Sequence, residues 1–143
     1  MPGVSQRTGA EAVMPQVSPF LEKALESLAG AESEFANRRF NNVANRCYYA
    51  AFQAAIVSLQ RAGIEPRSGR WGHDLVPAQF EGLLINRRHL YPGELRDVLS
   101  RNYTLRQAAD YNEAPTSQAQ ANHALRRTRT FLEAVQTKVG EDA

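Results

Sequence analysis

The chain has 143 residues, 43% of them hydrophobic, and a formal net charge of +2, which fits one globular domain with a core of its own. Its single cysteine, Cys47, excludes an intramolecular disulfide and favours a reducing, intracellular compartment. The sequence has neither a signal-peptide pattern in residues 1–15 nor an apolar run long enough to cross a bilayer, so we expect a cytoplasmic protein without a membrane segment.

The first predicted helix follows a polar tail. Residues 1–17 are rich in small and polar side chains without periodicity, which predicts a disordered N-terminal tail. Ser18 and Pro19 then supply a helix N-cap and a first-turn proline. Apolar residues recur at helical spacing with glutamates opposite, namely Leu21, Ala24, Leu25, Leu28, Ala31 and Phe35. This pattern predicts an amphipathic outer helix.

The second predicted helix spans about residues 40–62 and ends at Gly63. From Val43 to Leu59, 13 of 17 residues are apolar or aromatic. A helix with so few polar positions should be buried nearly all round, so we expect it at the centre of the molecule. Residues 64–72 contain a proline and two glycines, which predicts a loop.

Two further helices are expected in the second half of the chain. Asp74 can cap a third helix, in which the residues that share one face are Val76, Phe80, Leu83 and Leu84. Residues 87–91 break the periodicity. Pro92 can then open a fourth helix that continues to about Ala109.

The last predicted helix begins at a capping box formed by Ser117 and Gln120, and its apolar stripe reaches Val139. No segment alternates at period two for long enough to predict a strand. The sequence therefore predicts an all-α fold, an antiparallel up-and-down bundle of four to five helices over residues 18–140. Residues 141–143 are expected to form a C-terminal tail.

Polar side chains interrupt the apolar second helix. Arg46 and Gln53 lie two turns apart on one stripe, and a charge stranded in a core would be severely destabilising. We therefore expect Arg46 to face a cleft, a partner or a subunit interface. The aromatic residues Tyr48, Tyr49 and Phe52 are interpreted as core residues.

A second polar set lies on the fourth helix, where Tyr103, Arg106 and Asp110 share one face. One interpretation is a solvated Arg106–Asp110 ion pair worth a few tenths of a kcal/mol. The other is a cleft, since Asp110 and Tyr111 stand at the end of the helix. Arginine makes up 15 of the 17 basic residues, and its planar fork suits phosphate contacts, although such a bias also arises from codon composition.

Other chemistry finds little support in the sequence. His73, His89 and His123 lie on three separate segments without the spacing of metal ligands. Cys47 is interpreted as a buried core thiol. No phosphate-binding glycine loop is present. We therefore expect neither a metal nor a cofactor.

Two motifs resemble the HEPN family of small helical proteins, many of which belong to toxin–antitoxin pairs. The segment NRCYYAAF at residues 45–52 resembles the second-helix pattern of this family. The segment from Arg106 to Asp110 and Tyr111 resembles the late arginine, alanine-aspartate-tyrosine pattern of one subgroup. The resemblance implies an antiparallel bundle that forms a homodimer, with the late motif of both subunits lining a cleft.

The resemblance leaves two functions open. The first is the HEPN member of a toxin–antitoxin or defence pair that acts on RNA as a metal-independent ribonuclease. Arg106, Asp110 and Tyr111 would then be catalytic, and Arg46, Tyr103 and Arg106 would bind the nucleic acid. The second is a non-catalytic module that binds a nucleotide, RNA or a nucleotidyltransferase-type antitoxin partner.

One departure from the family pattern separates these alternatives. HEPN ribonucleases carry a histidine a few residues after the late arginine, whereas this chain has Asp110 and Tyr111 and no histidine after Arg106 on that helix. The pair Arg67 and His73 has a similar spacing but falls in the loop before the third helix. An ionised aspartate would repel phosphate, which weakens the expectation of catalysis.

Overall fold

The structure is a computed structural model that describes residues 18–66 and 68–142, so the predicted N-terminal tail lies outside the described residues. The described chain contains helices and no strand, which confirms the all-α prediction. The α-helices are α2 (Pro19–Ala36), α3 (Phe40–Arg61), α4 (Leu75–Gln79), α5 (Val98–Tyr111) and α6 (Gln118–Asp142). A π-helical segment, η1 (Phe80–Arg87), and a 3-10 turn, η2 (Gly93–Leu95), complete the set.

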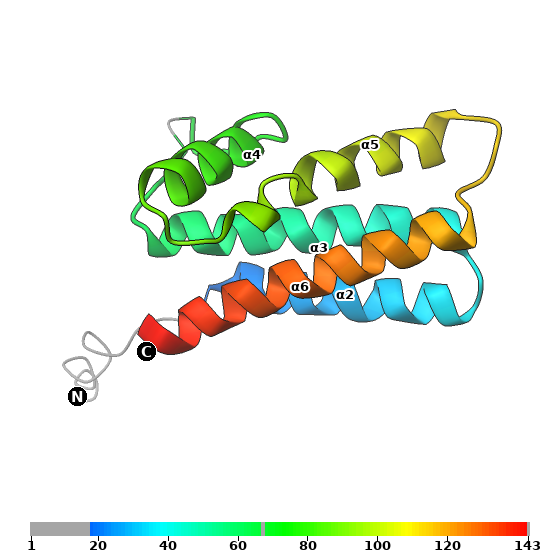
Figure 1. Ribbon diagram of the computed structural model, residues 1–143, viewed down its shortest axis with the longest axis horizontal. Helices are drawn as coiled ribbons and strands as arrows, with labels where there is room; N and C mark the ends of the chain where they lie inside the picture. Colours follow the sequence, from blue (N-terminus) through cyan, green and yellow to red (C-terminus); the bar gives the residue numbers. More distant parts are fainter. Residues whose placement is uncertain (1–17, 67, 143) are drawn as a thin grey trace, which may run out of the picture.

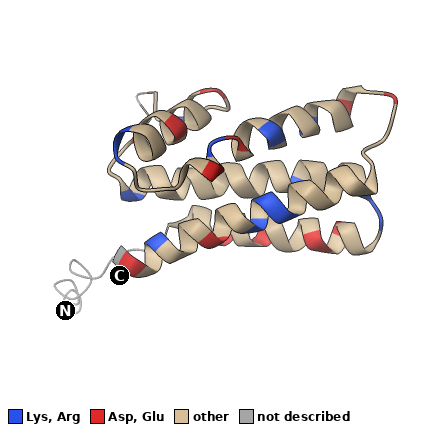
Figure 2. Cartoon of the chain, viewed as in Figure 1, with Lys and Arg blue, Asp and Glu red and all other residues tan. Residues whose placement is uncertain are grey.

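Helix α3 lies at the centre of the bundle and contacts α2, α4, α5 and α6 (Figure 1). Thirteen of its 22 residues are buried. Charged residues are sparse along it and gather on the surrounding helices, with acidic residues along α2 and basic residues in the middle of α6 (Figure 2). The prediction of a central second helix is therefore confirmed, because its apolar surface needs neighbours on every side.

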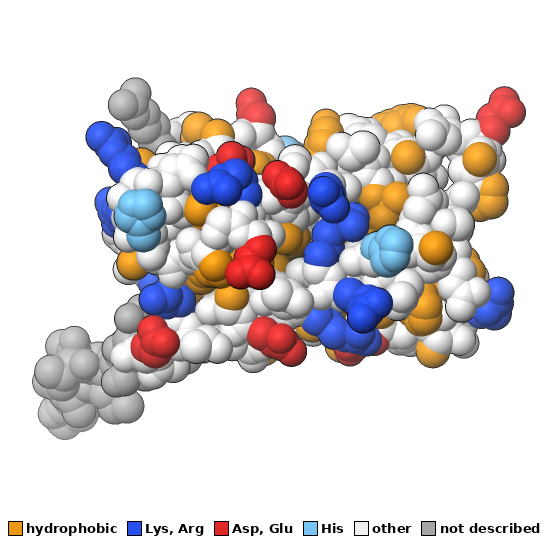
Figure 3. All heavy atoms as spheres, viewed as in Figure 1, with side chains coloured by type: hydrophobic (Ala, Val, Ile, Leu, Met, Phe, Trp, Pro, Cys, Tyr) orange, Lys and Arg blue, Asp and Glu red, His pale blue; other side chains and the backbone are white. Residues whose placement is uncertain are grey.

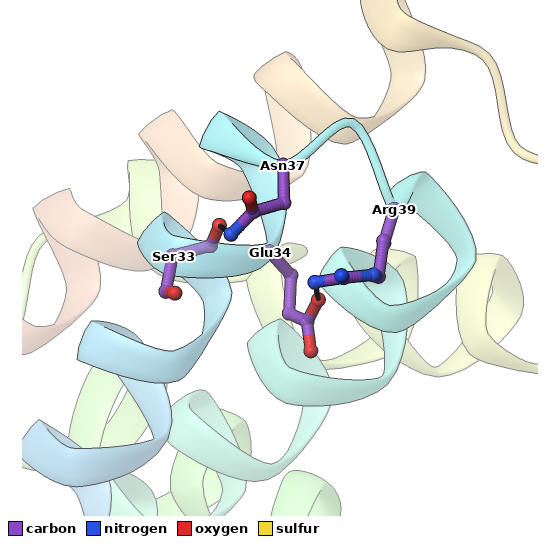
Figure 4. A network of polar contacts seen from close by, with 4 residues as sticks. All are labelled: Ser33, Glu34, Asn37 and Arg39. Carbon is purple, nitrogen blue, oxygen red and sulfur yellow. Dashed lines mark hydrogen bonds and ion pairs between the residues drawn. The ribbon is translucent and has the colours of Figure 1, made fainter.

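The turn between α2 and α3 is held by side chains at the end of α2 (Figure 4). Asn37 Nδ2 donates to the Ser33 carbonyl at 2.9 Å, and Arg39 pairs with Glu34 at 3.2 Å. Between them Arg38 has a φ of +61°, a left-handed conformation that reverses the chain within few residues. These contacts make α2 and α3 an antiparallel pair.

The C-terminus of α3 lies where the sequence predicts it. Gly63 has a φ of +79°, which suits glycine because it has no β-carbon. Its N–H donates to the Gln60 carbonyl, and the Ile64 N–H donates to the Leu59 carbonyl. This hydrogen-bond pattern is a Schellman motif, which ends the helix and starts the loop toward α4.

The third and fourth helices differ from the predicted single segments. The third is a short α4 that continues as the π-helical η1, and the wider π turn lets Phe80, Leu84 and Ile85 all reach the core. Pro92 has an extended ψ of 154°, so the chain makes the 3-10 turn η2, which buries Leu95, before α5 begins at Val98.

Helix α6 closes the core. Its predicted capping box is present, since Gln120 N–H donates to Ser117 Oγ at 3.1 Å and Ser117 N–H donates to Gln120 Oε1 at 2.9 Å. Phe131 of α6 packs on Phe80 with 4.9 Å between ring centroids. The helix continues to Asp142, past the predicted domain boundary at residue 140. No helix in the described ranges is long and apolar enough to span a membrane.

Cys47 is a core thiol, as predicted, and its side chain is fully buried. Burial raises the pKa of the Cys47 thiol from 9.0 to about 11, so between these values the unfolded chain loses the proton and the native chain keeps it. The unfolding free energy should therefore fall by about 2 kcal/mol from pH 9 to pH 11. Urea unfolding at the two pH values measures this, and a Cys47→Ala variant with the same loss would contradict it.

Candidate functional site

Arg106 packs against two tyrosine rings of the central helix. Its guanidinium carbon lies 4.9 Å from the ring centroid of Tyr48 and 5.3 Å from that of Tyr49. Both distances are within the range of a cation–π contact, which holds a cation over an aromatic face. The two tyrosines thus fix the position of one positive charge at the junction of α3 and α5.

Asp110 is the charged partner of Arg106 on α5. The Asp110 Oδ2 atom lies 3.6 Å from Arg106 Nε. The Asp110 side chain is 38% exposed and the Arg106 side chain is 24% exposed. At this distance the pair is an ion pair rather than a hydrogen bond, and the buried Nε atom makes no hydrogen bond within the described chain. The guanidinium is therefore held by contacts with two tyrosine rings and by one loose carboxylate.

Tyr48 links Arg106 to a histidine from the loop before α4. The Tyr48 hydroxyl is hydrogen-bonded to His73 Nδ1. The His73 ring also stacks on Phe52, with 4.9 Å between centroids. Burial raises the pKa of Tyr48 to about 12, and this effect outweighs the opposing effect of the Arg106 charge. Tyr48 therefore stays protonated at neutral pH and can donate a hydrogen bond.

A hollow opens beside this cluster on the side of α4. It has a volume of about 500 Å³, and its lining residues are His73, Asp74, Pro77, Leu99, Ser100 and Tyr103. The Tyr103 ring is 40% exposed, and its hydroxyl accepts a hydrogen bond from Gln107 Nε2 at 2.6 Å. A planar group in the hollow could stack on this ring while Arg106 holds an attached anion.

The part of the chain with assigned positions has no group of three or more histidine, cysteine, aspartate or glutamate side chains that could hold a metal ion. The chemistry available in the cluster is thus a fixed cation, a protonated phenol, an imidazole and a carboxylate. These groups can bind an anion and transfer protons.

Comparison with known proteins places the chain in a family. A family model described as HEPN domain matches residues 17–138. The chain belongs to the HEPN domain family. A curated relative named "Putative toxin MJ0605", from Methanocaldococcus jannaschii, is 22% identical over 129 residues, which cover 90% of this chain and 92% of that protein. The resemblance inferred from two short motifs is therefore confirmed.

In this HEPN domain the two motifs meet in space. The pair Tyr48 and Tyr49 of the first motif contacts Arg106 of the second, and Tyr103 lies 6.0 Å from Tyr48 between ring centroids. Asp110 joins them through its ion pair. Three of the predicted site residues, Tyr103, Arg106 and Asp110, thus belong to one cluster.

Two other predicted site residues lie apart from the ring contacts. Tyr111 is 80% exposed at the end of α5. Arg46 lies against α2, with its Nη1 atom 3.1 Å from where a β-carbon on Gly30 would stand. Gln53, on the same stripe, is in hydrogen-bonding contact with Ser27 of α2 at 2.9 Å. Both polar residues of the α3 stripe therefore contact α2 of the same chain, and Arg46 stays exposed to solvent.

The sequence places His73 in the loop before the third helix but predicts no part for it in the site, and it predicts Tyr48 and Tyr49 only as core residues. The three histidines of the chain stand on separate segments, so their spacing does not indicate a shared site. One signal was present, because Tyr48 and Phe52 stand four residues apart and form a two-ring surface on which a loop ring can stack. Only the path of residues 64–74, which the sequence does not specify, brings His73 to that surface.

Proposed function

We propose that this HEPN protein is the toxin-like member of a toxin–antitoxin or defence pair, and that it acts in the cytoplasm on RNA through the Arg106 cluster. The observation that carries the proposal is the Arg106 guanidinium, which is held on two tyrosine rings while its side chain remains 24% exposed. The name of its relative, a putative toxin, points the same way.

RNA suits the cluster for two physical reasons. A guanidinium offers paired donors that match a phosphate, and its charge persists at every physiological pH. The exposed Tyr103 ring beside a hollow offers a stacking surface for a base, a contact worth roughly 1–3 kcal/mol. Single-stranded RNA supplies both groups in one ligand.

Cleavage would need a proton acceptor. The family pattern expects a histidine after Arg106 on α5, whereas in this chain the histidine of the cluster is His73, from the loop before α4. His73 lies one hydrogen bond from Tyr48, and the Tyr48 ring contacts Arg106. Under the proposal Arg106 binds the phosphate, Asp110 orients Arg106 through the ion pair, and Tyr111 contacts the RNA from the helix end. His73 and Tyr48 provide the groups for proton transfer.

A non-catalytic module is the second candidate. Asp110 places a negative charge beside the proposed phosphate site, and α5 carries no histidine after Arg106. The 80% exposed Tyr111 would suit contact with a partner such as a nucleotidyltransferase-type antitoxin. In this alternative the cluster binds RNA or a nucleotide without cleaving it.

The experiment that tests the proposal compares the parent with an Asp110→Asn variant. Induction of the parent gene in a bacterial host should slow growth and fragment RNA, and the purified protein should bind RNA less tightly as salt rises. Asp110→Asn removes a repelling charge, so binding should tighten while cleavage that depends on the Arg106 orientation falls. A parent that neither binds RNA nor harms the host would refute the proposal.

We expect the protein to be a homodimer, as HEPN membership favours. The large exposed ring of Tyr111 beside the Arg106–Asp110 pair would suit a two-fold contact between α5 helices that joins two clusters. Light scattering at micromolar concentration should give a mass near 32 kDa, twice the 15.9 kDa chain. A monomer across the accessible concentration range would contradict this expectation, and Tyr111→Ser should shift the equilibrium toward monomer.

A further inference from the structure

A second basic site lies between α5 and α6, away from the tyrosine cluster. A hollow of about 280 Å³ is lined there by Arg101, Thr104, Leu105, Ala108, Gln120, His123 and Arg127. On the surface over α5 and α6, basic side chains gather on either side of a histidine (Figure 3). The residues of α5 that line this hollow are rotated about the helix axis relative to Tyr103, Arg106 and Asp110, so α5 presents two different faces to the two sites.

Arg127 is held in place by a buried hydrogen-bond network. Its Nε donates to Asn102 Oδ1 at 2.7 Å. Asn102 is 1% exposed, and its amide nitrogen donates to the Cys47 carbonyl at 3.1 Å and to Thr128 Oγ1 at 2.9 Å. A buried amide is costly unless its bonds are made, and here both of its donors and its oxygen are engaged.

The network fixes the Arg127 guanidinium through a neutral amide, so no carboxylate of the described residues neutralises its positive charge. Asn102 is neutral, and none of the ion pairs among residues 18–66 and 68–142 involves Arg127. Only the Nε atom is engaged, so the two terminal nitrogens remain as donors. Burial, and secondarily the nearby Arg101 charge, lower the pKa of Arg127. Two like charges thus line one hollow, and Arg101 has only a loose partner, Asp97, at 3.9 Å.

We propose that the Arg101–Arg127 hollow is a second anion site, which binds a phosphate group. Phosphate has acceptor oxygens for both guanidinium groups, and its charge removes the repulsion between them. Under the proposed function the phosphate belongs to the RNA backbone, beyond the nucleotide at Arg106.

The first arm of the test detects phosphate binding without RNA. In ¹⁵N-labelled protein the Nε–Hε signal of Arg127 should be protected by its bond to Asn102. Adding inorganic phosphate should shift the Arg127 and Arg101 signals, whereas sodium chloride at the same ionic strength should not. Arg126, an exposed neighbour on α6 that does not line the hollow, serves as the internal control. If the Arg127 and Arg101 signals respond equally to both salts, the phosphate site is refuted.

The second arm identifies the source of the phosphate. Arg127→Gln should weaken binding of a single-stranded RNA about tenfold and lower the salt slope by about 0.7, and Arg126→Gln should not. Arg101→Gln, at an exposed residue, tests the site with the Asn102 network intact. If phosphate shifts the signals but neither variant affects RNA binding, the site binds free phosphate and the RNA assignment is wrong.

Failure of the proposed function would be visible separately. A parent protein that binds no RNA refutes the RNA proposal, while the phosphate titration still decides whether the hollow is an anion site. If Arg106→Ala loses RNA binding while Arg127→Gln binds RNA as the parent does, RNA contacts only the tyrosine cluster. The proposal that a phosphate of the RNA backbone binds in the hollow would then be wrong.

Discussion

Replacing Arg106 with alanine should weaken RNA binding about ten- to a hundredfold and abolish any toxicity in the host. The reason is the loss of a fixed charge and of forked donors, since a hydrogen bond to a charged group contributes about 1.5–3 kcal/mol. The fold should persist, because the lost cation–π contacts contribute only about 1 kcal/mol each. Fluorescence anisotropy with a labelled single-stranded RNA measures the change.

Two variants make the Arg106 test specific. Arg106→Lys keeps the charge but loses the planar fork, so it should bind RNA with intermediate affinity. Arg87→Ala removes an exposed charge from η1 and should bind as the parent does, after correction for a small nonspecific salt effect. Equal losses in Arg106→Ala and Arg87→Ala would show that net charge alone drives binding, and the Arg106 site would then be rejected.

Replacing Phe52 with alanine should lower the unfolding free energy by roughly 3–5 kcal/mol, the usual cost of emptying a large aromatic site in a core. Phe52 is 7% exposed and packs against Tyr48 at 5.9 Å and His73 at 4.9 Å between ring centroids. The variant should also release His73 from its stacking surface. Urea unfolding followed by circular dichroism gives the free energy.

Leu25→Ala is the matched control for the core prediction. Leu25 is an apolar residue of α2 that is 36% exposed, so its truncation removes less buried area and should cost much less than Phe52→Ala. Similar losses in the two variants would mean that Phe52 does not stand at the centre of the bundle. A fall in the unfolding free energy of less than about 1 kcal/mol for Phe52→Ala would likewise show that Phe52 is not a central core residue.

Local pattern was sufficient to predict the main helices. The start of α2 is set by Ser18, whose side-chain oxygen accepts a hydrogen bond from the first turn of the helix. The C-terminus of α3 is set by Gly63, which adopts a positive φ. Both effects act within a few residues of the chain. The capping box of Ser117 and Gln120 is equally local. The π-helical η1 and the delayed start of α5 were not predictable, because they depend on which side chains the rest of the core must accommodate.

The sequence by itself determined the all-α fold, the central helix and the HEPN family. These properties depend on periodicity, capping residues and two short motifs, all of which are readable over short distances in the chain. It also identified Arg106 and Asp110 as one pair, since they stand four residues apart on α5.

Only the tertiary structure decided which distant groups meet these residues. It brought Tyr48 and Tyr49 to Arg106 and His73 to Tyr48. It also placed Arg46 against α2 and anchored Arg127 on the buried Asn102. Each of these contacts joins residues at least 16 positions apart in the sequence. The physical reason is that side-chain contacts between helices are set by the packing of the whole bundle, which no local pattern specifies.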